Sequence, residues 1–292
     1  KANKFKIEIF YYRKNSKLAK NFINKHQIKN STTNLDLFYS KSITECDAMV
    51  ICVKTEFVCQ YLRKFANYKK PVLVEKPGAI NYTDLYSIKK LKISKKLFFG
   101  YNRRYYENIE YVKKYLTLNK KNNVLIKIPD NIQTFHQFII NGCHIIDLIF
   151  YLFGNIKLIF KSGQIDDKVK GFVFNAKNTK NIFTFIVNWG VPDNFSIDIF
   201  SNRKRVLISP IETTYFYEEM KIIEPTDKYP LRKYEPKIMK SYTIKNFKFK
   251  PGFKNQYKNF YTFIKTNKYS KKDCDFKQAL KVLSFIEELK MN

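Results

Sequence analysis

Lys76 is the first residue of this chain whose surroundings suggest chemistry. The apolar run 72–74, Val-Leu-Val, predicts a buried strand that leads into Glu75, Lys76 and Pro77. In open parallel α/β sheets, ligands bind beyond the carboxyl ends of the strands. A lysine in this place is positioned for chemistry, and the fixed φ of Pro77 stiffens the turn that presents it. The alternative is a solvated turn lysine, which is the usual environment of this residue type.

His144 is the second candidate for chemistry. It lies near the start of an apolar helix predicted for residues 142–153, and Asp147 follows three residues later. Residues three apart share one face of a helix, so the Asp147 carboxylate can orient the imidazole. The alternative is a half-buried histidine whose hydrogen bonds are satisfied locally, beside an Asp147 that caps a helix or joins a salt bridge.

A basic cluster lies between these two candidates along the chain. Tyr101, Arg103 and Arg104 follow the next predicted strand. Neighbouring guanidinium groups favour contact with a substrate phosphate or carboxylate, which arginine binds through two parallel hydrogen bonds. The alternative is a hinge that carries solvated charges.

The elements that must position these residues alternate in the first hundred residues. Strands are predicted at 5–12, 48–53, 72–74 and 97–101, and helices at 16–25, 57–65 and 83–93. Asn81 and Asp84 stand in capping-box positions at the start of the third helix. This β-α-β order is typical of a parallel doubly wound sheet. It predicts a first domain over residues 1–101.

The pattern changes after Tyr101 and predicts a second domain over residues 102–292. A helix at 105–116, a strand at 124–128 and the helix at 142–153 precede four or five strands, in the runs 156–161, 169–175, 182–189, 195–201 and 205–209. Their alternation predicts an open, mainly antiparallel sheet with one solvated face. Residues 218–249 carry prolines and charges and predict a loop with an edge strand. Helices are predicted at 253–266 and 276–290, so the fold class is α/β followed by α+β.

Composition excludes several other classes of protein. With 55 Lys and Arg against 25 Asp and Glu, the net charge is +30, but the lysines are spread over the whole chain and arginine is scarce. This distribution favours a solvated surface over a specific nucleic-acid site. Five scattered cysteines and three histidines show no metal-ligand spacing, which predicts no metal site and a reducing, cytoplasmic location. No apolar run approaches the length that spans a membrane.

Three stretches together resemble one protein family. They are Val-Leu-Val-Glu-Lys-Pro at 72–77, Phe-Phe-Gly-Tyr-Asn-Arg-Arg-Tyr at 98–105, and Gly-Cys-His-Ile-Ile-Asp-Leu-Ile-Phe-Tyr-Leu-Phe-Gly at 142–154. Their order and spacing are similar to those of the glucose–fructose oxidoreductase, inositol dehydrogenase and MocA (Gfo/Idh/MocA) family of NAD(P)-dependent oxidoreductases. Weaker similarities lie at Trp189-Gly190 and at Lys250-Pro251-Gly252-Phe253.

The resemblance implies a dinucleotide-binding Rossmann domain and a catalytic role for two residues. Lys76 resembles the family lysine beside the nicotinamide, where a cation stabilises a developing alkoxide. His144 resembles the family acid/base that takes the hydroxyl proton. The implied substrate is a sugar or nucleotide-sugar, and surface-polysaccharide synthesis is the implied pathway. The exposed face of an open sheet must be covered, which suggests a homodimer or homotetramer.

The resemblance also implies binding residues. The expected cofactor-binding residues are Arg13, Lys14, Thr55 and Glu75. The expected substrate-binding residues are Tyr101, Arg104, Asn141 and Asp147. A basic pair after the first predicted strand, where NAD enzymes of this fold place an acid, accommodates a 2′-phosphate and favours NADP over NAD.

Two departures from the family pattern support a rival hypothesis. No glycine precedes Gly78, so the glycine-rich turn that holds a pyrophosphate is not present and the first βα unit of the family is expected to be missing. Ile140 occupies the position, one helical turn before His144, where the family usually has a carboxylate. A truncated or catalytically inactive paralogue that serves as a scaffold is the alternative function.

Overall fold

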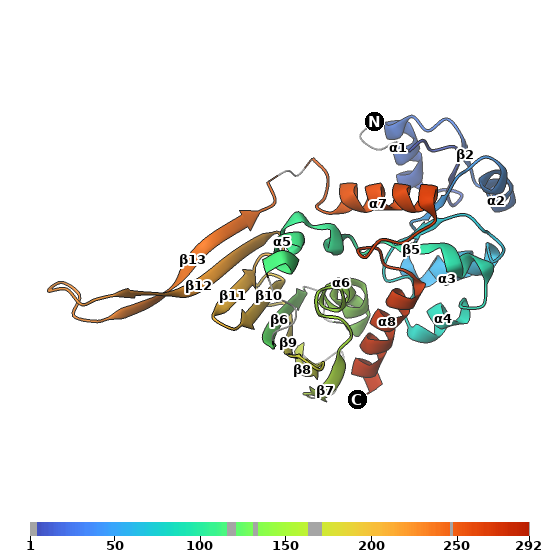
Figure 1. Cartoon of the computed structure of the whole chain (residues 1–292). Helices are drawn as coiled ribbons and strands as arrows, with labels where there is room; N and C mark the ends of the chain where they lie inside the picture. The colour runs from blue at the N-terminus through green and yellow to red at the C-terminus, as the bar shows by residue number, and fades with distance from the viewer. Residues whose placement is uncertain (1–4, 116–120, 131–133, 163–170, 246–247, 292) are drawn as a thin grey trace. The chain divides into compact units, whose positions relative to one another are not determined.

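The computed structural model describes every residue except 1–4, 116–120, 131–133, 163–170, 246–247 and 292. The chain forms two compact units (Figure 1): unit 1 is Lys1–Gly100 with Lys254–Leu280, and unit 2 is Tyr101–Phe253 with Lys281–Asn292. The first division lies beside the predicted domain boundary. The stretch Lys254–Leu280, which lies within the predicted second domain of residues 102–292, is part of unit 1, where its Phe260 and Phe263 pack against Phe98.

Unit 1 is a set of short parallel strands with helices between them. Its elements are β1 (Phe10–Tyr11), α1 (Lys17–His26), β2 (Ser31–Thr32), α2 (Leu35–Thr44), β3 (Met49–Ile51), α3 (Thr55–Lys64), β4 (Val72–Val74), α4 (Tyr82–Ser87), η1 (Lys92–Lys96), β5 (Leu97–Phe99) and α7 (Phe253–Thr266). β1 pairs with β2, and β3, β4 and β5 form a parallel sheet in that order. The predicted parallel, Rossmann-type organisation is confirmed.

Local signals in the sequence determine several helix starts in unit 1. The Ser16 side chain accepts a hydrogen bond from the backbone of Ala19 at the start of α1. Asn81 does the same for Asp84 at the start of α4. These polar side chains satisfy N–H groups that have no partner inside the helix. The predicted helix 83–93 is shorter in the structure, because α4 ends at Ser87 and a 3₁₀ turn follows.

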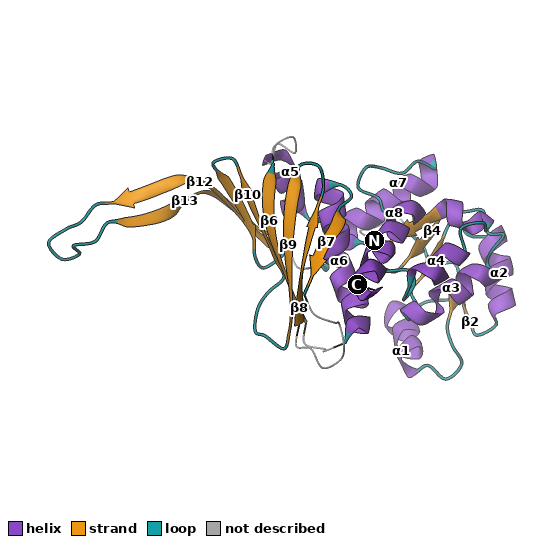
Figure 2. Cartoon of the chain, turned by 90° about the horizontal axis from the view of Figure 1, so that it is seen from below, coloured by secondary structure: helices purple, strands orange, loops and turns teal. Residues whose placement is uncertain are grey.

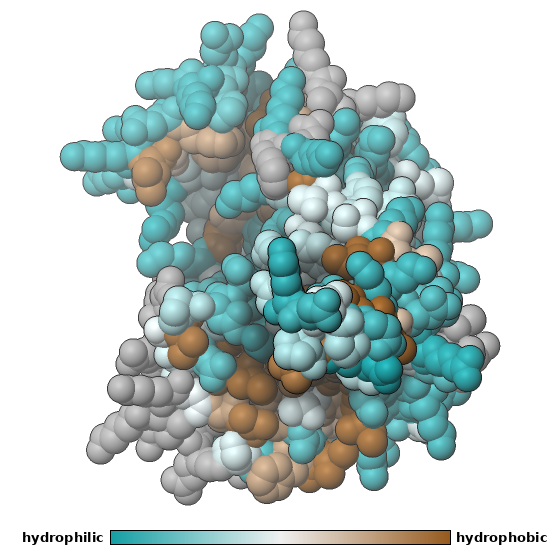
Figure 3. All heavy atoms as spheres, turned by 90° about the vertical axis from the view of Figure 1, so that its left-hand side faces the viewer, coloured by the Kyte–Doolittle hydropathy of each residue, from teal (hydrophilic) through white to brown (hydrophobic). Residues whose placement is uncertain are grey.

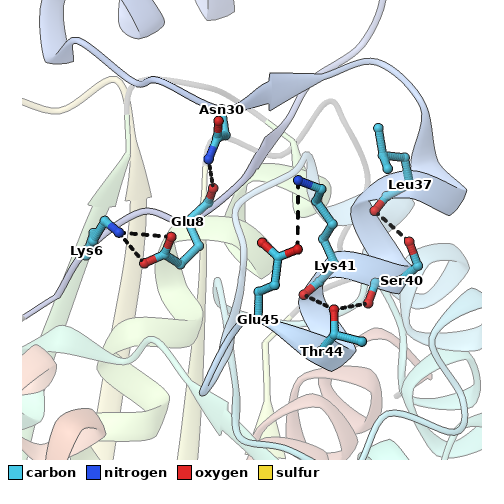
Figure 4. Close-up of polar contacts among 8 residues, drawn as sticks. All are labelled: Lys6, Glu8, Asn30, Leu37, Ser40, Lys41, Thr44 and Glu45. Atoms are coloured by element: carbon cyan, nitrogen blue, oxygen red, sulfur yellow. Dashed lines mark hydrogen bonds and ion pairs between the residues drawn. The ribbon is translucent and has the colours of Figure 1, made fainter.

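The prediction overlooked β2 and α2, and Figure 4 shows the contacts that hold this region. The Asn30 side chain donates a hydrogen bond to the carbonyl of Glu8, 3.0 Å away, ahead of the β1–β2 pair. Within α2, the hydroxyls of Ser40 and Thr44 donate to helix carbonyls, and Lys41 pairs with Glu45. Serine and threonine compete with the backbone for hydrogen bonds and disfavour helix, so the sequence of α2 did not suggest one.

Unit 2 is built on one eight-stranded sheet. Its elements are η2 (Asn102–Tyr105), α5 (Glu107–Tyr115), β6 (Asn122–Asp130), α6 (Phe135–Phe153), β7 (Lys157–Lys161), β8 (Gly171–Lys177), β9 (Asn181–Trp189), β10 (Ser196–Ser201), β11 (Lys204–Ile208), β12 (Thr213–Ile223) and β13 (Lys233–Thr243). The strand order is β13-β12-β11-β10-β6-β9-β8-β7. Only the β6–β9 pair is parallel among these named strands, so the predicted open, mainly antiparallel sheet is confirmed.

The core of unit 2 lies between one face of this sheet and the helix α6. Along β9 the residues alternate, and those on the inner face, such as Phe183 and Phe185, are fully buried. The ring of Phe153 in α6 contacts Phe183 edge-on, with ring centroids 5.3 Å apart. Alternation of this kind is what an antiparallel sheet with one covered face requires. α8 (Phe276–Met291) joins the same core through Phe285, which contacts Phe174.

The helix α6 is longer than predicted. It begins at Phe135, capped by the Thr134 side chain, and Gly142 lies inside it. Among the described residues it is the one helix long and apolar enough to cross a membrane by length and composition. The expectation that no segment reaches that length is therefore corrected. Its apolar residues pack on the sheet, as in the core helix of a globular unit.

The segment predicted as loop with an edge strand is instead a long hairpin. β12 and β13 each have eleven residues and pair along their length, with irregular register near Tyr217. Figures 1 and 2 show the pair extending well beyond the other strands of the sheet. Prolines and mixed charges are compatible with an edge hairpin because its exposed sides face solvent. The composition of this segment therefore could not distinguish a hairpin from a loop.

Candidate active site

The carboxyl ends of β3, β4 and β5 meet at one edge of the unit 1 sheet. The backbone of Glu75, directly after β4, donates to the carbonyl of Ile51 in β3. Gly100, directly after β5, donates to Val74. Burial, with Cys52 and Glu75 close by, raises the pKa of Tyr257 in α7 to about 12. The ends of β4 and β5 and the helix α7 therefore lie near the half-buried Glu75 carboxylate.

The Lys76 turn follows the same strand. The Lys76–Pro77 peptide is cis, Lys76 is half-buried, and Gly78 has φ +91°. A Cβ on Gly78 would lie 2.4 Å from the ring of Phe99 in β5. Glycine is thus required both for its backbone conformation and for the close approach of Phe99. The position predicted for Lys76, at the carboxyl end of a buried strand, is the observed one.

Two of the predicted cofactor-binding residues, Arg13 and Thr55, lie at the start of α3, and a third, Lys14, follows Arg13 in the chain. Arg13 and Lys14 are exposed after β1, and Thr55 is the first residue of α3. The Arg13 guanidinium carbon lies 6.0 Å from the ring centroid of Phe57, in the first turn of α3. The structure therefore brings Arg13 to the same helix start as Thr55. The amino end of a helix favours negative charge such as phosphate.

Gln256 was not identified from the sequence and is a buried polar side chain of unit 1 that can serve a ligand. It is 1% exposed, and its Oε1 has no hydrogen-bond partner among the described residues. Its Nε2 lies 3.4 Å from the position that a Cβ on Gly100 would take, at the end of β5. A buried acceptor without a donor is costly. No motif marks it, because its role follows from α7 returning to this sheet.

These residues fit part of a nicotinamide dinucleotide. Gln256 Oε1 offers an acceptor for a carboxamide or a ribose hydroxyl, beside Glu75 and the Lys76 turn. The pyrophosphate of such a cofactor usually lies on a glycine-rich turn, and residues 1–77 contain no glycine. The fit therefore concerns the nicotinamide and ribose portions.

His144 and Asn141 lie together on the least buried side of α6. Both are half-buried, as is Ile140, whereas their neighbours Gly142 and Cys143 are buried. The Tyr101 ring is fully buried and meets the His144 imidazole edge-on, with centroids 6.1 Å apart and planes at 88°. The structure therefore brings together three residues that the sequence proposed separately: Tyr101, Asn141 and His144.

Arg104 and Asp147 form an ion pair in the interior of unit 2. Arg104 Nε donates to one carboxylate oxygen at 2.7 Å and Nη2 to the other at 2.5 Å. Their side chains are 2% and 1% exposed. The Asp147 carboxylate that was expected to orient His144 is thus bound at both oxygens by Arg104. This geometry gives the two predicted substrate-binding residues a positioning role between η2 and α6.

Arg103 is the arginine of this cluster with capacity left for an anion. Its guanidinium carbon lies 4.4 Å from the ring centroid of Phe195, and its Nη1 is buried without a hydrogen-bond partner among the described residues. Burial lowers the pKa of Arg103, opposed by Tyr106, Cys143 and Glu212 nearby. Cys143 is adjacent to His144, so Arg103 lies beside the imidazole-bearing part of α6. The sequence proposed both Arg103 and Arg104 for contact with an anion. Only the packing shows that Arg104 is paired with Asp147, whereas Nη1 of Arg103 has no partner among the described residues.

The described residues contain no group of three or more His, Cys, Asp or Glu placed to hold a metal ion. Two remaining histidines are not assigned to a site: the His26 ring lies tilted against Phe22, with centroids 4.4 Å apart, and His136 is exposed in the first turn of α6.

Comparisons with known proteins agree with this architecture. Residues 3–102 match the model of the Gfo/Idh/MocA family, described as an oxidoreductase family with an NAD-binding Rossmann fold. No curated protein matches the sequence.

Solved structures extend the likeness to the rest of the chain. A Gfo/Idh/MocA family oxidoreductase from Vibrio cholerae is 11% identical with a TM-score of 0.70, covering 97% of this chain and 88% of that one. UDP-N-acetylglucosamine 3-dehydrogenase GnnA from Acidithiobacillus ferrooxidans is 13% identical with a TM-score of 0.71, covering 95% and 87%. An oxidoreductase from Agrobacterium radiobacter, in complex with NAD+, L-tartaric acid and magnesium, is 13% identical with a TM-score of 0.73, covering 97% and 88%.

The resemblance inferred from the three sequence stretches is therefore confirmed. Residues 3–102 match the NAD-binding Rossmann model of the Gfo/Idh/MocA oxidoreductase family, and the chain as a whole has the fold of solved members of that family.

Proposed function

We propose that this chain is an NAD(P)-dependent oxidoreductase that moves a hydride between a nicotinamide cofactor and a hydroxyl or keto carbon of a sugar or nucleotide-sugar. The observation that carries the proposal is the match of residues 3–102 to an NAD-binding oxidoreductase family, with Lys76 at the carboxyl end of β4. The similar fold of a UDP-N-acetylglucosamine 3-dehydrogenase supports a nucleotide-sugar. Surface-polysaccharide synthesis in the cytoplasm is the proposed setting.

Each candidate residue has a defined task in this proposal. The bound nicotinamide accepts or supplies the hydride. His144, half-buried on α6 and held edge-on by Tyr101, takes the hydroxyl proton in the oxidative direction. The Lys76 ammonium group stabilises the negative charge that develops on the substrate oxygen. Asn141, on the same side of α6 as His144, contacts the substrate.

The environment of Arg103 favours a substrate that carries an anionic group. Its buried Nη1 and its contact with Phe195 suit a flat, bidentate interaction with a phosphate or a carboxylate. A nucleotide-sugar or an acidic sugar has such a group, and a neutral sugar does not. We therefore propose Arg103, in place of Arg104, as the residue that selects the anionic substrate.

NADP is the proposed cofactor, with NAD as the alternative. Arg13 and Lys14 are adjacent exposed cations, and Arg13 lies near the start of α3, where a 2′-phosphate gains favourable charge. Titration of the protein with NADP+ and with NAD+ by calorimetry tests this. We expect the ratio of affinities to favour NADP+ and to fall at least tenfold in the variant with Arg13→Ala and Lys14→Ala. Equal affinity for the two nucleotides would remove the preference.

The oxidoreductase activity is tested with Lys76→Ala. Turnover with a panel of UDP-sugars and NADP+ is expected to fall by roughly 10²-fold or more, because the stabilisation of a developing oxyanion is lost. Calorimetry of the same variant is expected to give nucleotide affinity within threefold of the unchanged protein. Lys89→Ala, an exposed lysine after α4, serves as control. Unchanged turnover in Lys76→Ala would exclude this lysine from the mechanism.

A catalytically inactive scaffold is the second candidate function, and Ile140 favours it. Its side chain is half-buried on α6, one turn before His144, where the family usually has a carboxylate. If the chain is an enzyme, Ile140→Asp gives His144 a proton-transfer partner and raises turnover several-fold. A wild-type protein without nucleotide binding or turnover, and unchanged by Ile140→Asp, would establish the scaffold function.

Self-association is part of the proposal. The inner face of the unit 2 sheet is covered by α6, while its outer face carries exposed apolar side chains such as Ile182 and Phe200. A homodimer or homotetramer covers such a face.

A further inference from the structure

Trp189 carries a buried N–H group that no acceptor in the described part of the chain satisfies. It is the only tryptophan of the sequence and the last residue of β9. Its side chain is 3% exposed, and Nε1 has no hydrogen-bond partner among the described residues. A buried indole N–H usually finds an acceptor, because leaving it without one costs free energy. This position therefore suits an acceptor atom that a ligand brings.

Burial distinguishes Trp189 from apolar side chains that stay at the surface of unit 2. Figure 3 shows brown apolar side chains among teal polar ones on one face of the molecule. Val191, two residues after Trp189, is 47% exposed, and Phe200 in β10 is 43% exposed. Bulk water reaches such side chains, whereas Nε1 of Trp189 is buried.

Trp189 lies on the inner face of the sheet, at the end of the parallel pair β6–β9. In the strand register it is opposite Asp130, the last residue of β6. Side chains alternate along β9, so Trp189 shares the face of Phe185 and Val187, which are fully buried. The indole is therefore on the side of the sheet that α6 covers.

Aromatic contacts connect Trp189 to the first half of α6. The Phe172 ring in β8 meets the indole edge-on, with centroids 6.2 Å apart. Phe172 in turn meets Phe138 of α6, with centroids 5.4 Å apart. Phe138 lies three residues before Asn141, which the proposed function assigns to the substrate. Trp189 therefore belongs to the same region of unit 2 as that residue.

Arg103 contributes a second buried N–H group at the same end of the sheet. The loop 190–195 joins β9 to β10, which lie on either side of β6. Trp189 precedes this loop, and Phe195 at its end contacts the Arg103 guanidinium, whose Nη1 has no partner among the described residues. Neighbouring strands are about 4.8 Å apart, so β9 and β10 are separated by about 10 Å. A nucleotide-sugar is long enough to reach both N–H groups.

The surroundings of Nε1 restrict the kind of acceptor. The indole N–H only donates, and the neighbouring rings of Phe172 and Phe138 have no hydrogen-bonding group. A sugar hydroxyl that accepted this N–H would bring its own O–H among these rings, where it lacks an acceptor. A carbonyl oxygen needs only the one donor, and the methyl group of an acyl substituent gains from contact with the rings. The site therefore favours an acylamino group over a hydroxyl.

We propose that the Trp189 indole N–H donates to the carbonyl oxygen of an acylamino substituent on the sugar, while Arg103 binds the anionic group of the same molecule. Trp189 is then a specificity-determining residue of unit 2. This inference rests on the proposed function, and it narrows the substrate to a nucleotide-sugar that carries an acylamino group.

Fluorescence of the single tryptophan tests the proposal directly. UDP-N-acetylglucosamine and UDP-glucose differ only in having an acetamido group or a hydroxyl at one carbon, so they form a matched pair of probes. Each is titrated with and without NADP+. We expect UDP-N-acetylglucosamine to change the emission of Trp189 saturably and to bind at least about fivefold more tightly than UDP-glucose, as the gain of one hydrogen bond predicts. Equal affinity for the two probes would overturn the proposal.

Trp189→Phe removes the N–H group and keeps an aromatic ring. Calorimetry of this variant is expected to give nearly equal affinities for the two probes. Its thermal unfolding without ligand is expected at the same temperature or higher, since an unsatisfied donor is removed. Tyr229→Phe, which removes a hydroxyl from a side chain 66% exposed, is the control and is expected to leave the preference unchanged. A preference that survives in Trp189→Phe would exclude the indole N–H from recognition.

Nuclear magnetic resonance of the unchanged protein gives the same information if Trp189→Phe does not fold. A ¹⁵N-labelled chain has a single indole N–H resonance, because it has one tryptophan. We expect UDP-N-acetylglucosamine to move the proton signal downfield, as a new hydrogen bond does, and UDP-glucose to leave it nearly unchanged. An indole signal that responds to neither probe would overturn the proposal.

The outcomes also separate this inference from the proposed function. Turnover of UDP-sugars that does not depend on the acylamino group would keep the oxidoreductase and refute recognition by Trp189. Binding of UDP-N-acetylglucosamine that depends on Trp189, in a chain that neither binds NADP+ nor turns over, would support the recognition and refute the oxidoreductase.

Discussion

Arg104 and Asp147 join η2 to α6 through a bidentate ion pair in the interior of unit 2. The two hydrogen bonds measure 2.7 Å and 2.5 Å, and neither side chain is more than 2% exposed. The same helix carries His144, one turn before Asp147. The pair therefore fixes the position of the imidazole relative to Tyr101, which directly precedes η2.

Breaking this pair is expected to cost much more than breaking an exposed one. Arg104→Ala leaves a buried carboxylate without its cation, and we expect a loss of about 3–5 kcal/mol in the free energy of unfolding. Arg205→Ala, which removes the partly exposed pair with Asp198, is the control and is expected to cost about 1 kcal/mol or less. Urea denaturation measures both. Equal losses of unfolding free energy in the two variants would show that the buried Arg104–Asp147 pair stabilises the fold no more than the exposed pair.

The double variant Arg104→Met with Asp147→Leu separates packing from charge. Replacing both partners by apolar residues leaves no unpaired charge, so its stability is expected to be close to that of the unchanged protein. Turnover with UDP-sugars is nevertheless expected to fall, because the bidentate contact that orients α6 is lost. Full turnover in the double variant would remove the positioning role of the pair.

Gln256 is expected to contribute to nucleotide binding. It is not expected to stabilise the ligand-free protein. Its buried Oε1 has no partner among the described residues, so Gln256→Leu removes an unsatisfied acceptor. Thermal unfolding of the ligand-free variant is expected at the same temperature or higher. Its nucleotide affinity, measured by calorimetry, is expected to fall about fivefold, since one hydrogen bond contributes about 1 kcal/mol. A large loss of stability would mean that Gln256 has a structural role.

Arg103→Met tests whether the substrate carries an anion. The KM for a UDP-sugar is expected to rise 10- to 100-fold with kcat nearly unchanged, as removal of a charged hydrogen bond of about 1.5–3 kcal/mol predicts. A neutral sugar is expected to be affected less than threefold. Lys121→Met, an exposed lysine before β6, is the control. An equal rise in KM for the charged and neutral substrates would refute anion recognition by Arg103.

Cys59 is expected to make the stability of unit 1 fall at alkaline pH. Its thiol donates to the carbonyl of Gly78, and burial raises its pKa from 9.0 to about 11. Above pH 9 the thiol ionises in the unfolded chain before it does in the folded protein. Its contribution is therefore complete below pH 9 and is lost as the pH rises toward 11.

Urea denaturation between pH 8 and pH 11 measures this effect. Cys59→Ala is expected to show a shallower decline in unfolding free energy, by up to about 1.4 kcal/mol per pH unit in that window. Cys46→Ala, at a less buried thiol, is the control. An identical slope in Cys59→Ala and the unchanged protein would show that this thiol ionises equally in both states.

Short-range sequence signals determined much of the fold. The observed β4 has the bounds of the apolar run 72–74, and α7 has the bounds predicted from its spacing. Ser16 and Asn81 act as helix caps, as such side chains do when they precede a helical pattern. These features depend on neighbours in the chain, so periodicity and composition reveal them. The same reasoning failed for α2, whose Ser and Thr residues disfavour the helix that its surroundings impose.

Long-range contacts decided the rest. The sequence by itself determined the family resemblance, the order of most strands and helices, and the positions of Lys76 and His144 within it. Only the tertiary structure paired Arg104 with Asp147, left Nη1 of Arg103 without a partner among the described residues, brought Gln256 of α7 to the end of β5, and extended β12 and β13 into a long hairpin. The physical reason is that burial and hydrogen-bond partners depend on segments far apart in the chain, and no local pattern encodes which of two adjacent arginines will be enclosed.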